Sequence, residues 1–338
     1  MSARGSIVIL AGPTASGKTG LACALARALD GEVISADSQQ CYRGLDAGTA
    51  KPTREEQSQA PHHLLDIAWP EQQLDTAQFI ARADAAIEDV RARGKRVLVA
   101  GGTGLWIRAL VQGLALAPGR DEDFRAGFRE RLAREGLPAL FSELQRIDPE
   151  AARRILPGDR QRIERALEVH AKSGQTLSSL QRAHRFAERR YRARVVLLDP
   201  PRELLWQRIE ARTRALFTPG PDGAEASLLR ETRALLARVR EIPAAGRALG
   251  IIGYGEAAAA LAETEHAVAS SALDAACALV AARTRQYAKR QRTWFRKDAP
   301  ALDETGAPLP WPPPVDADLD AARNSLCSIL REWYESAR

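Results

Sequence analysis

Cysteine is scarce in this sequence and is not paired. The 338 residues include four cysteines, and no two of them form a C-x-x-C pattern. Structural zinc sites and disulfide scaffolds depend on paired or closely spaced cysteines, so neither is predicted. The adjacent His62 and His63 lack a third ligand at helical or cysteine-pair spacing, which argues against a metal site there.

Long apolar runs are also missing. No run approaches the ~20 residues of a membrane-spanning helix, and the first residues carry no apolar secretory segment. We therefore expect a cytoplasmic monomer with no membrane contact and no obligate protein partner. The hydrophobic content of 45% is enough for a folded core, whereas the net charge of +6 is too small to indicate a partner by itself.

The octapeptide from Gly12 to Thr19 matches the P-loop pattern G-x-x-x-x-G-K-[ST]. An apolar run, residues 6–11, precedes it, and a helical pattern, residues 20–29, follows it. In that context, backbone N–H groups and the helix N-terminus bind phosphate. We expect Lys18 to reach the terminal phosphate and the Thr19 hydroxyl to coordinate Mg²⁺. The predicted diphosphate-binding residues are Gly12, Pro13, Thr14, Ala15, Ser16, Gly17, Lys18 and Thr19.

Short apolar runs alternate with long helical patterns, as is typical of a parallel sheet flanked by helices. The predicted strands are Ile7–Leu10, Glu32–Ser35, Arg96–Ala100 and Val195–Leu198. Residues 121–193 instead place apolar residues at helical spacing. We therefore predict an α/β fold, a P-loop NTPase-like parallel sheet with an inserted all-helical domain. The predicted parts are a discontinuous core of residues 1–120 and 194–299, a helical insertion of residues 121–193, and a Pro-rich tail of residues 300–338 with a short helix.

An acidic residue, Asp37, follows the second predicted strand. The carboxyl ends of parallel strands meet at one edge of a sheet, where the P-loop also lies. Asp37 is therefore placed to act as a general base or a metal ligand beside a bound phosphate compound. A helix N-cap is the alternative, because Ser-Gln-Gln follows it.

The third predicted strand lacks the acid that hydrolytic P-loop enzymes carry. Ala100 stands where a Walker-B Asp is usual, and a second glycine-rich turn, Gly101–Gly104, follows it. We expect the backbone of this turn and the Thr103 hydroxyl to approach the same anion, although a tight turn alone also explains the glycines. These features favour holding a phosphate cluster as a leaving group over activating water against it.

Basic residues are concentrated in two blocks. The block near the end of the core carries Arg285, Lys289, Arg292 and Arg296 on one face of a predicted helix. Aromatic residues interleave with these cations, a combination that is typical of RNA recognition. The alternative is a solvated helix whose aromatic residues pack on the core. Asp274 is the one acid between residues 266 and 297, so few internal partners are expected for this charge.

The other basic block lies in the insertion and its end. Its arginines are Arg160, Arg162, Arg165, Arg182, Arg185, Arg189, Arg190, Arg192 and Arg194. A further set, Arg208, Arg212 and Arg214, follows the fourth strand. One of these three is predicted to clamp a departing diphosphate. Spacing alone does not choose among them, and a surface helix is the alternative.

Several motifs taken together resemble one family, the tRNA dimethylallyltransferases (tRNA isopentenyltransferases). The P-loop alone is shared with many kinases, whereas the ordered set from about residue 5 to 297 is specific. Beyond the P-loop, the matching segments are Ser35–Gln40, Asp46–Pro52, Pro61–Asp66, Val99–Leu105, Asp159–Glu168, Gly253–Tyr254 and Thr284–Trp294.

The resemblance implies transfer of a dimethylallyl group from dimethylallyl diphosphate to N6 of the adenosine 3′ to the anticodon, after that base has flipped into the site. Asp37 then resembles the general base, and Thr103 and Arg212 resemble contacts to the diphosphate, with Arg208 as the fallback. The implied tRNA-facing residues are Asp37, Ser38, Gln39, Gln40, Thr103, Arg125, Gln161, Arg162, Ile163, Glu164, Arg165, Gly250, Ile251, Ile252, Gly253, Tyr254, Gly255, Lys289, Arg290, Gln291, Arg292, Thr293, Trp294, Phe295 and Arg296. The implied partners are Mg²⁺, dimethylallyl diphosphate and the tRNA anticodon stem-loop.

Two other functions use the same P-loop. A kinase acting on a nucleoside or another small metabolite predicts turnover of a nucleoside triphosphate, whereas the transferase predicts release of diphosphate. A nucleic-acid-binding switch that only senses a nucleotide leaves Asp37 and Thr103 without a role.

Overall fold

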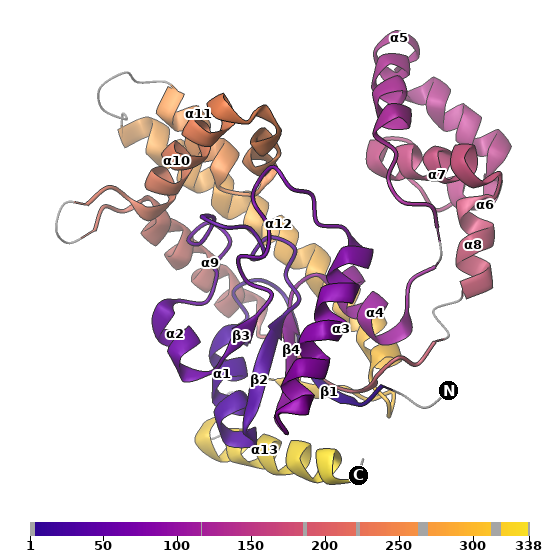
Figure 1. The fold of residues 1–338 in the computed structure, drawn as a ribbon. Coiled ribbons are helices and arrows are strands. Elements are labelled where there is room, and N and C mark those ends of the chain that lie inside the picture. The colour runs from indigo at the N-terminus through magenta and orange to yellow at the C-terminus, as the bar shows by residue number, and fades with distance from the viewer. Residues whose placement is uncertain are drawn as a thin grey trace. The chain divides into compact units, whose positions relative to one another are not determined.

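The four apolar runs predicted as strands lie side by side in the computed structural model, which describes residues 4–115, 117–184, 188–220, 224–262, 270–311 and 319–336. They are β1 (Ser6–Ala11), β2 (Gly31–Ser35), β4 (Arg96–Gly101) and β5 (Arg192–Leu198). With the short β3 (His62–His63) and β6 (Leu309–Trp311), the described strands form one sheet in the order β3-β2-β4-β1-β5-β6. Figure 1 labels β1 to β4 of this sheet. Every neighbouring pair is parallel, so the predicted fold class is confirmed.

The chain divides into two compact units. One consists of Met1–Val111 with Arg190–Arg338, and the other of Gln112–Arg189. We call them the core and the insertion, respectively. Two predicted features lie outside the described residues in whole or part: Arg185, and residues 312–318 and 337–338 of the tail.

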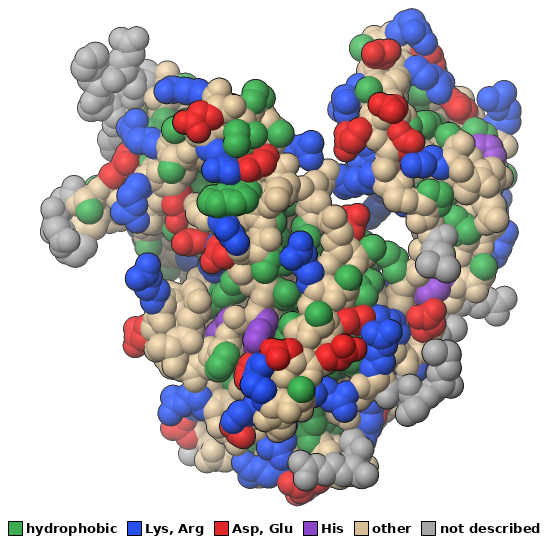
Figure 2. All heavy atoms as spheres, in the orientation of Figure 1, with side chains coloured by type: hydrophobic (Ala, Val, Ile, Leu, Met, Phe, Trp, Pro, Cys, Tyr) green, Lys and Arg blue, Asp and Glu red, His purple; other side chains and the backbone are tan. Residues whose placement is uncertain are grey.

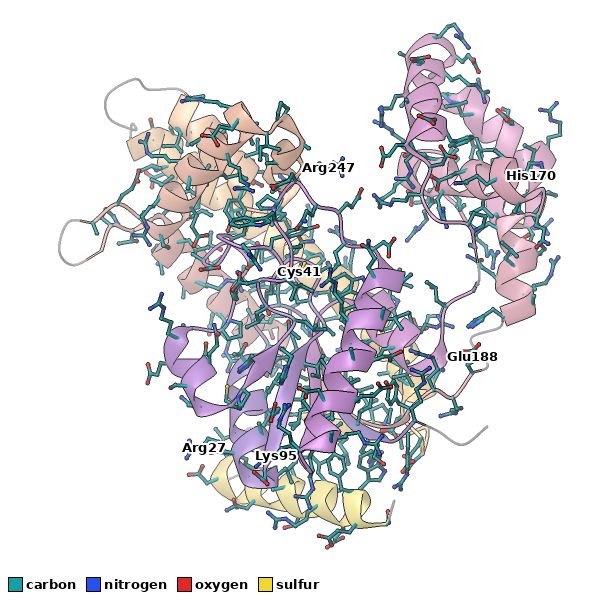
Figure 3. All side chains as sticks on the ribbon, viewed as in Figure 1. Arg27, Cys41, Lys95, His170, Glu188 and Arg247 are labelled. Atoms are coloured by element: carbon teal, nitrogen blue, oxygen red, sulfur yellow. The ribbon has the colours of Figure 1, made fainter. Side chains whose placement is uncertain are left out.

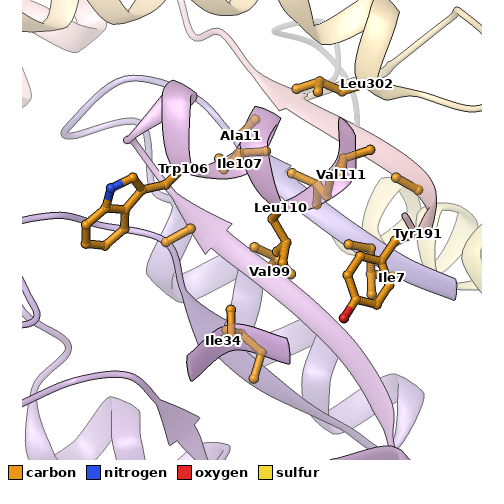
Figure 4. Packing of buried hydrophobic residues seen from close by; sticks show 14 of the residues in the cluster. Ile7, Ala11, Ile34, Val99, Trp106, Ile107, Leu110, Val111, Tyr191 and Leu302 are labelled. Carbon is orange, nitrogen blue, oxygen red and sulfur yellow. The ribbon is translucent and has the colours of Figure 1, made fainter. Parts of the chain in front are cut away.

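The sheet of the core is buried on both faces, and its strand β1 is apolar and buried from Ile7 to Ala11. Ile7 and Ile9 of β1 belong to one cluster of buried side chains, and Val8 and Leu10 belong to another. The first cluster includes Trp106, Ile107 and Tyr191 (Figure 4). Period-two alternation on a doubly covered strand produces this arrangement, since successive side chains point to opposite faces.

Helices cover the two faces. Residues of α3 (Thr76–Ala92), α4 (Gly104–Gln112) and α12 (Ser270–Leu302) supply the first cluster, and residues of α1 (Lys18–Leu29) and α13 (Leu319–Glu335) supply the second. The remaining helices of the core are α2 (Arg54–Gln59), α9 (Arg202–Phe217), α10 (Ser227–Glu241), η1 (Pro243–Gly250, a 3-10 helix) and α11 (Tyr254–Ala262). A third apolar cluster joins α9, α10, η1 and α11 to α12.

The insertion is helical, as its leucine spacing predicted. Its helices are α5 (Glu122–Ile147), α6 (Pro149–Ala152), α7 (Arg160–Ser173) and α8 (Leu177–His184). Leu140 and Leu144 of α5 pack with Ile163 and Leu167 of α7 in a separate apolar cluster. Gly136, at φ 78°, interrupts α5 with a kink.

The segment beyond residue 300 is part of the core and not a tail outside it. Leu309 to Trp311 pair with β5 as a sixth strand. α13 contributes Leu326, Leu330 and Trp333 to the apolar cluster on the α1 face. Prolines at the edge of a sheet are tolerated because an edge strand donates fewer ladder hydrogen bonds, and the proline content therefore did not reveal this strand.

Leu330 tests whether α13 supports the core. Leu330 is fully buried, whereas the neighbouring Ile329 is 41% exposed. We expect Leu330→Ala to lower the free energy of unfolding by about 2–4 kcal/mol, the cost of a cavity in a packed core. Urea denaturation measures the change. Ile329→Ala is the matched control and should cost less than about 0.5 kcal/mol; equal effects would show that α13 does not pack as described.

Candidate active site at the P-loop edge

The P-loop leaves β1 at Ala11 and enters α1 at Lys18, as predicted. Two residues take left-handed backbone conformations, Ala15 at φ 62° and Gly17 at φ 91°. Gly17 caps α1 without a side-chain hydrogen bond. The first N–H groups of α1 are therefore available to an anion, which is the arrangement that makes a helix N-terminus a phosphate site.

Lys18 folds back over the loop. Its ammonium donates to the carbonyl oxygens of Gly12 at 3.0 Å and Pro13 at 2.6 Å. Burial lowers its pKa to about 8; the nearby Asp37 carboxylate opposes this shift, and the guanidinium of Arg212 adds to it. A buried cation with a lowered pKa is poised to gain from a bound diphosphate, since an anion restores the charged form.

Two arginines of α9 reach the loop. Arg212 Nη1 donates to Thr14 Oγ1 at 3.2 Å, and Arg208 Nη1 donates to the Ser16 carbonyl at 3.4 Å. Within the described residues, Arg212 Nε and Ser16 Oγ are buried and have no hydrogen-bond partner. Buried polar atoms are normally satisfied, so two orphaned donors beside a P-loop fit a bound diphosphate. Arg212 therefore fits the clamp better than Arg208, whose guanidinium reaches only a carbonyl.

Asp37 lies in a turn that follows β2. Its Oδ1 accepts from the backbone N–H groups of Gln39 at 2.9 Å and Gln40 at 3.4 Å. The turn does not continue into a helix, so the carboxylate stabilises a loop and not a helix start. Lys18, Arg212 and Tyr287 all lie within electrostatic reach of this carboxylate. Burial, the largest cause, and Asp37 raise the pKa of the Tyr287 phenol.

Thr103 fastens the two loops that follow β2 and β4. Its Oγ1 accepts from the Ser38 N–H at 2.9 Å and donates to Ser38 Oγ at 3.2 Å. A Cβ atom on Gly101 would lie 2.1 Å from the Ala36 carbonyl oxygen. Gly101 thus allows the backbones of the two loops to approach closely. Thr103 contacts Ser38, the residue that follows Asp37, and therefore lies near Asp37.

The segment around Asp46 is tied to the loops at this edge by hydrogen bonds and ion pairs. The amino-acid sequence did not predict this role. Lys51 Nζ donates to the Tyr42 carbonyl at 2.8 Å and to the Asp66 carboxylate at 2.6 Å, and it also pairs with Asp46. The Glu231 carboxylate of α10 accepts from the Ala47 N–H at 2.8 Å.

Gln40 lines the same edge. Its amide donates to the Ala50 carbonyl at 2.9 Å. Together with Thr19, Ser35 and Asp37, it lines a cavity of about 30 Å³, enough for a water-sized ligand. The oxygens of Thr19, Ser35 and Asp37 are the hard ligands that Mg²⁺ prefers, so these residues fit the predicted metal. The described residues bring no three His, Cys, Asp or Glu side chains together as a metal site.

The residues predicted to face tRNA on α12 divide by burial. Lys289, Arg290, Thr293 and Arg296 are exposed. Gln291 is 6% exposed and Phe295 is 1% exposed, so little of either side chain is open to solvent, and their contact with tRNA stays a prediction. Phe295 belongs to the core cluster, and Trp294 packs against that cluster. Both aromatic residues follow the alternative of packing on the core.

Partners for the α12 cations come from other elements. Arg292 and Arg296 share Asp199, which follows β5, at 2.6 and 2.7 Å, and Arg285 pairs with Glu210 of α9 at 3.0 Å. The expectation of few internal partners is wrong because it counted acids only within one segment. Over the face drawn in Figure 2, Lys and Arg side chains are interspersed with Asp and Glu.

Residues 250–255 precede and begin α11. The Tyr254 side chain is fully buried and donates to Glu231 Oε2 at 2.6 Å, and its place on the tRNA-facing segment stays a prediction. Gly253 is also buried, whereas Gly250 is exposed and Ile251, Ile252 and Gly255 are half-buried.

The insertion holds Arg125 and Arg165 on one buried acid. Both donate to Glu168, at 2.7 and 2.5 Å, and Glu168 is fully buried. Burial raises its pKa, but the hydrogen bonds from Arg125, the Asp121 N–H and Arg165 outweigh burial and lower the pKa to about 2. This one carboxylate balances one of the two positive charges, so the group keeps a net positive charge.

The other predicted residues of the insertion alternate in exposure. Gln161 and Arg162 are exposed on α7. Ile163 and Glu164 are buried, and their contact with tRNA stays a prediction. A helix that packs one face on its neighbours turns every third or fourth side chain inward.

The arginine block at the end of the insertion is not one surface. Arg190 precedes β5, and Arg192 and Arg194 lie in it. All three belong to the core and pair with Asp84, Glu304 and Asp303, respectively. The interpretation of these three as part of a basic insertion surface is wrong.

None of the helices in the described ranges combines the length and apolar character that a membrane crossing requires.

The chain is similar in sequence to known proteins over most of its length. The model of the IPP transferase family matches residues 40–298. A tRNA dimethylallyltransferase from Anaeromyxobacter dehalogenans (strain 2CP-C) is 51% identical over 295 residues, 86% of this chain and 92% of the relative. One from Geobacter metallireducens is 45% identical over 293 residues, 87% of this chain and 90% of the relative.

Solved structures agree with the sequence relatives. The full-length tRNA isopentenylpyrophosphate transferase from Bacillus halodurans superposes with a TM-score of 0.64 at 32% identity, over 98% of this chain and 97% of that one. A eukaryotic dimethylallyltransferase acting on tRNA has a TM-score of 0.77 at 24% identity, over 98% of this chain and 80% of that one. At that identity, the second match bears on the fold alone.

Proposed function

The chain belongs to the IPP transferase family, and from that membership we propose how its P-loop edge transfers a dimethylallyl group to tRNA. The donor is dimethylallyl diphosphate, and the acceptor is N6 of the adenosine 3′ to the anticodon. The bond between the allylic carbon and the diphosphate oxygen breaks, a carbon–N6 bond forms, and diphosphate and one proton leave.

The observation that carries this proposal is the pair of orphaned donors, Arg212 Nε and Ser16 Oγ, beside Lys18. An allylic C–O bond breaks with cation character, so most of the barrier is the charge that grows on the diphosphate. Donors fixed in advance around that charge stabilise it without reorganising. This chemistry needs no Walker-B acid, consistent with Ala100 at that position.

Asp37 receives the acceptor nitrogen. The exocyclic amine of adenine is a weak nucleophile, so a carboxylate that accepts a hydrogen bond from N6 orients it and takes the proton as the new bond forms. Thr19 is the residue that would hold Mg²⁺, with Asp37 nearby. When bound, that ion neutralises charge on the diphosphate oxygens.

One incubation tests the proposal. The protein is mixed with Mg²⁺, dimethylallyl diphosphate and unmodified tRNA, and the nucleosides of the recovered tRNA are analysed. We expect isopentenyladenosine and one diphosphate per modified tRNA. A parallel reaction with ATP and nucleosides tests the kinase alternative; ATP consumption without any prenylated adenosine would overturn the proposal.

Exposed cations on α12 are expected to contribute most to tRNA affinity. Arg290 is exposed and stacks over the Tyr287 ring at 5.8 Å, whereas Arg292 already pairs with Asp199. We expect Arg290→Ala to lower the salt slope of tRNA binding by about one counterion and the affinity by roughly tenfold. Filter binding between low and moderate salt measures both. Arg292→Ala is the matched control and should change the slope less; an equal loss would contradict the assignment.

A further inference from the structure

A glutamine is buried within the basic stretch of α12. Gln291 is 6% exposed, although Arg290 beside it is exposed. Its position falls on the inward stripe of the helix, between the buried Ala288 and Phe295. A buried amide needs partners for both its oxygen and its nitrogen, and the contacts of Gln291 are therefore informative.

Both ends of this amide are used. Gln291 Oε1 accepts from the Thr14 N–H of the P-loop at 2.8 Å, and Nε2 donates to the Gly102 carbonyl at 2.9 Å. β1 and β4, which carry these two loops, are adjacent parallel strands, with Ala11 opposite Gly101. One side chain thus bridges the two glycine-rich loops at the edge where the diphosphate is proposed to bind.

The geometry leaves little freedom in that bridge. A Cβ atom on Gly102 would lie 2.3 Å from Gln291 Nε2, so any side chain at position 102 would displace the Gln291 amide from this bridge. Thr14 also receives the Arg212 guanidinium through its hydroxyl. We call the P-loop together with Arg212 the cradle. Because Gln291 fixes the backbone of Thr14, it also fixes the residue of the cradle that Arg212 contacts. Because it fixes Gly102, it also restricts the position of the next residue, Thr103.

We propose that Gln291 is a positioning residue for the diphosphate: its side chain holds the P-loop and the Thr103 loop at a set separation and does not contact tRNA. The inference rests on the proposed function for the identity of the ligand. A carboxylate could keep the bond from Thr14 but not the bond to Gly102, and it would place negative charge beside the diphosphate. An apolar side chain of equal length loses both bonds and leaves two buried backbone groups unpaired.

Two variants and one matched control test the role. Gln291→Met removes both hydrogen bonds at similar volume, and Gln291→Glu removes one and adds charge. Gln286→Met makes the same replacement at an exposed position of the same helix. Calorimetry with Mg²⁺ and inorganic pyrophosphate measures the cradle directly, filter binding measures tRNA affinity, and steady-state kinetics give the KM values of both substrates.

We expect Gln291→Met to weaken pyrophosphate binding and raise the KM for dimethylallyl diphosphate at least tenfold, with tRNA affinity within twofold of the parent protein. Gln291→Glu should weaken pyrophosphate binding further, and Gln286→Met should change neither. Retained tRNA affinity separates this result from unfolding, because tRNA binding requires a folded core. A tenfold loss of tRNA affinity with unchanged pyrophosphate binding in either Gln291 variant would overturn the inference. Pyrophosphate binding needs no turnover, so a failure of the proposed reaction would be seen separately.

Discussion

Replacing Asp37 with alanine is expected to lower kcat by about 10²–10⁴, the range that a positioned general base contributes, with little change in tRNA affinity. The carboxylate lies at the cradle beside Lys18 and Arg212. Its Oδ1 takes both backbone hydrogen bonds of the turn, and within the described residues no partner is assigned to Oδ2. That oxygen is free to accept the N6 hydrogen and then the proton that the amine loses.

The variant Asp37→Asn separates the effect of losing the carboxylate charge from the effect of disrupting the turn. Asparagine keeps an oxygen that can accept from the Gln39 and Gln40 N–H groups, so the loop should persist. It cannot take up a proton at neutral pH, and single-turnover rates should therefore fall nearly as far as in Asp37→Ala. Asp30→Asn is a matched control, because Asp30 precedes β2 at the opposite edge of the sheet and pairs only with Lys95 among the described residues. A rate within twofold of the parent protein in Asp37→Asn would contradict the base assignment.

The long buried strands could be predicted from the sequence, whereas the short edge strands could not. β1, β2, β4 and β5 were predictable because each is a buried run bounded by polar or glycine-rich turns. β3 has two residues and β6 has three, too few for any periodicity. Both exist because a neighbouring strand offers backbone partners, which is a property of the assembled sheet.

The site was predictable where a motif fixes local geometry and less so where it depends on distant partners. The P-loop and Asp37 follow directly from strand ends. The bridge from Gln291 to Thr14 spans 277 residues, and Asp199 neutralises Arg292 from 93 residues away. One signal was present: a glutamine on the stripe formed by Ala288, Phe295 and Ala299 is a buried polar residue in need of partners.

Lys18→Met is expected to lower kcat/KM for dimethylallyl diphosphate by at least about 10²–10³, the loss seen when one preorganised donor to a developing anion is removed. The ammonium is held by the Gly12 and Pro13 carbonyls, so it is positioned over the loop before the substrate arrives. Methionine keeps the length of the stem and removes the charge. Lys95→Met at the far end of the sheet, where Figure 3 labels Lys95, is the matched control and should leave kcat/KM unchanged.

The pH dependence gives the same residue a second signature. Burial lowers the pKa of Lys18 to about 8, so the free protein carries the charge below that pH and loses it above. We expect kcat/KM for dimethylallyl diphosphate to fall about tenfold per pH unit above that point, because kcat/KM reports the ionisation of the free enzyme. A bound diphosphate favours the charged ammonium and raises its pKa, so kcat should stay level to higher pH. Lys18→Met has no group to titrate there, and its residual kcat/KM should show no break near pH 8. A break that persists in Lys18→Met would assign the titration to another group and leave Lys18 as a fixed charge.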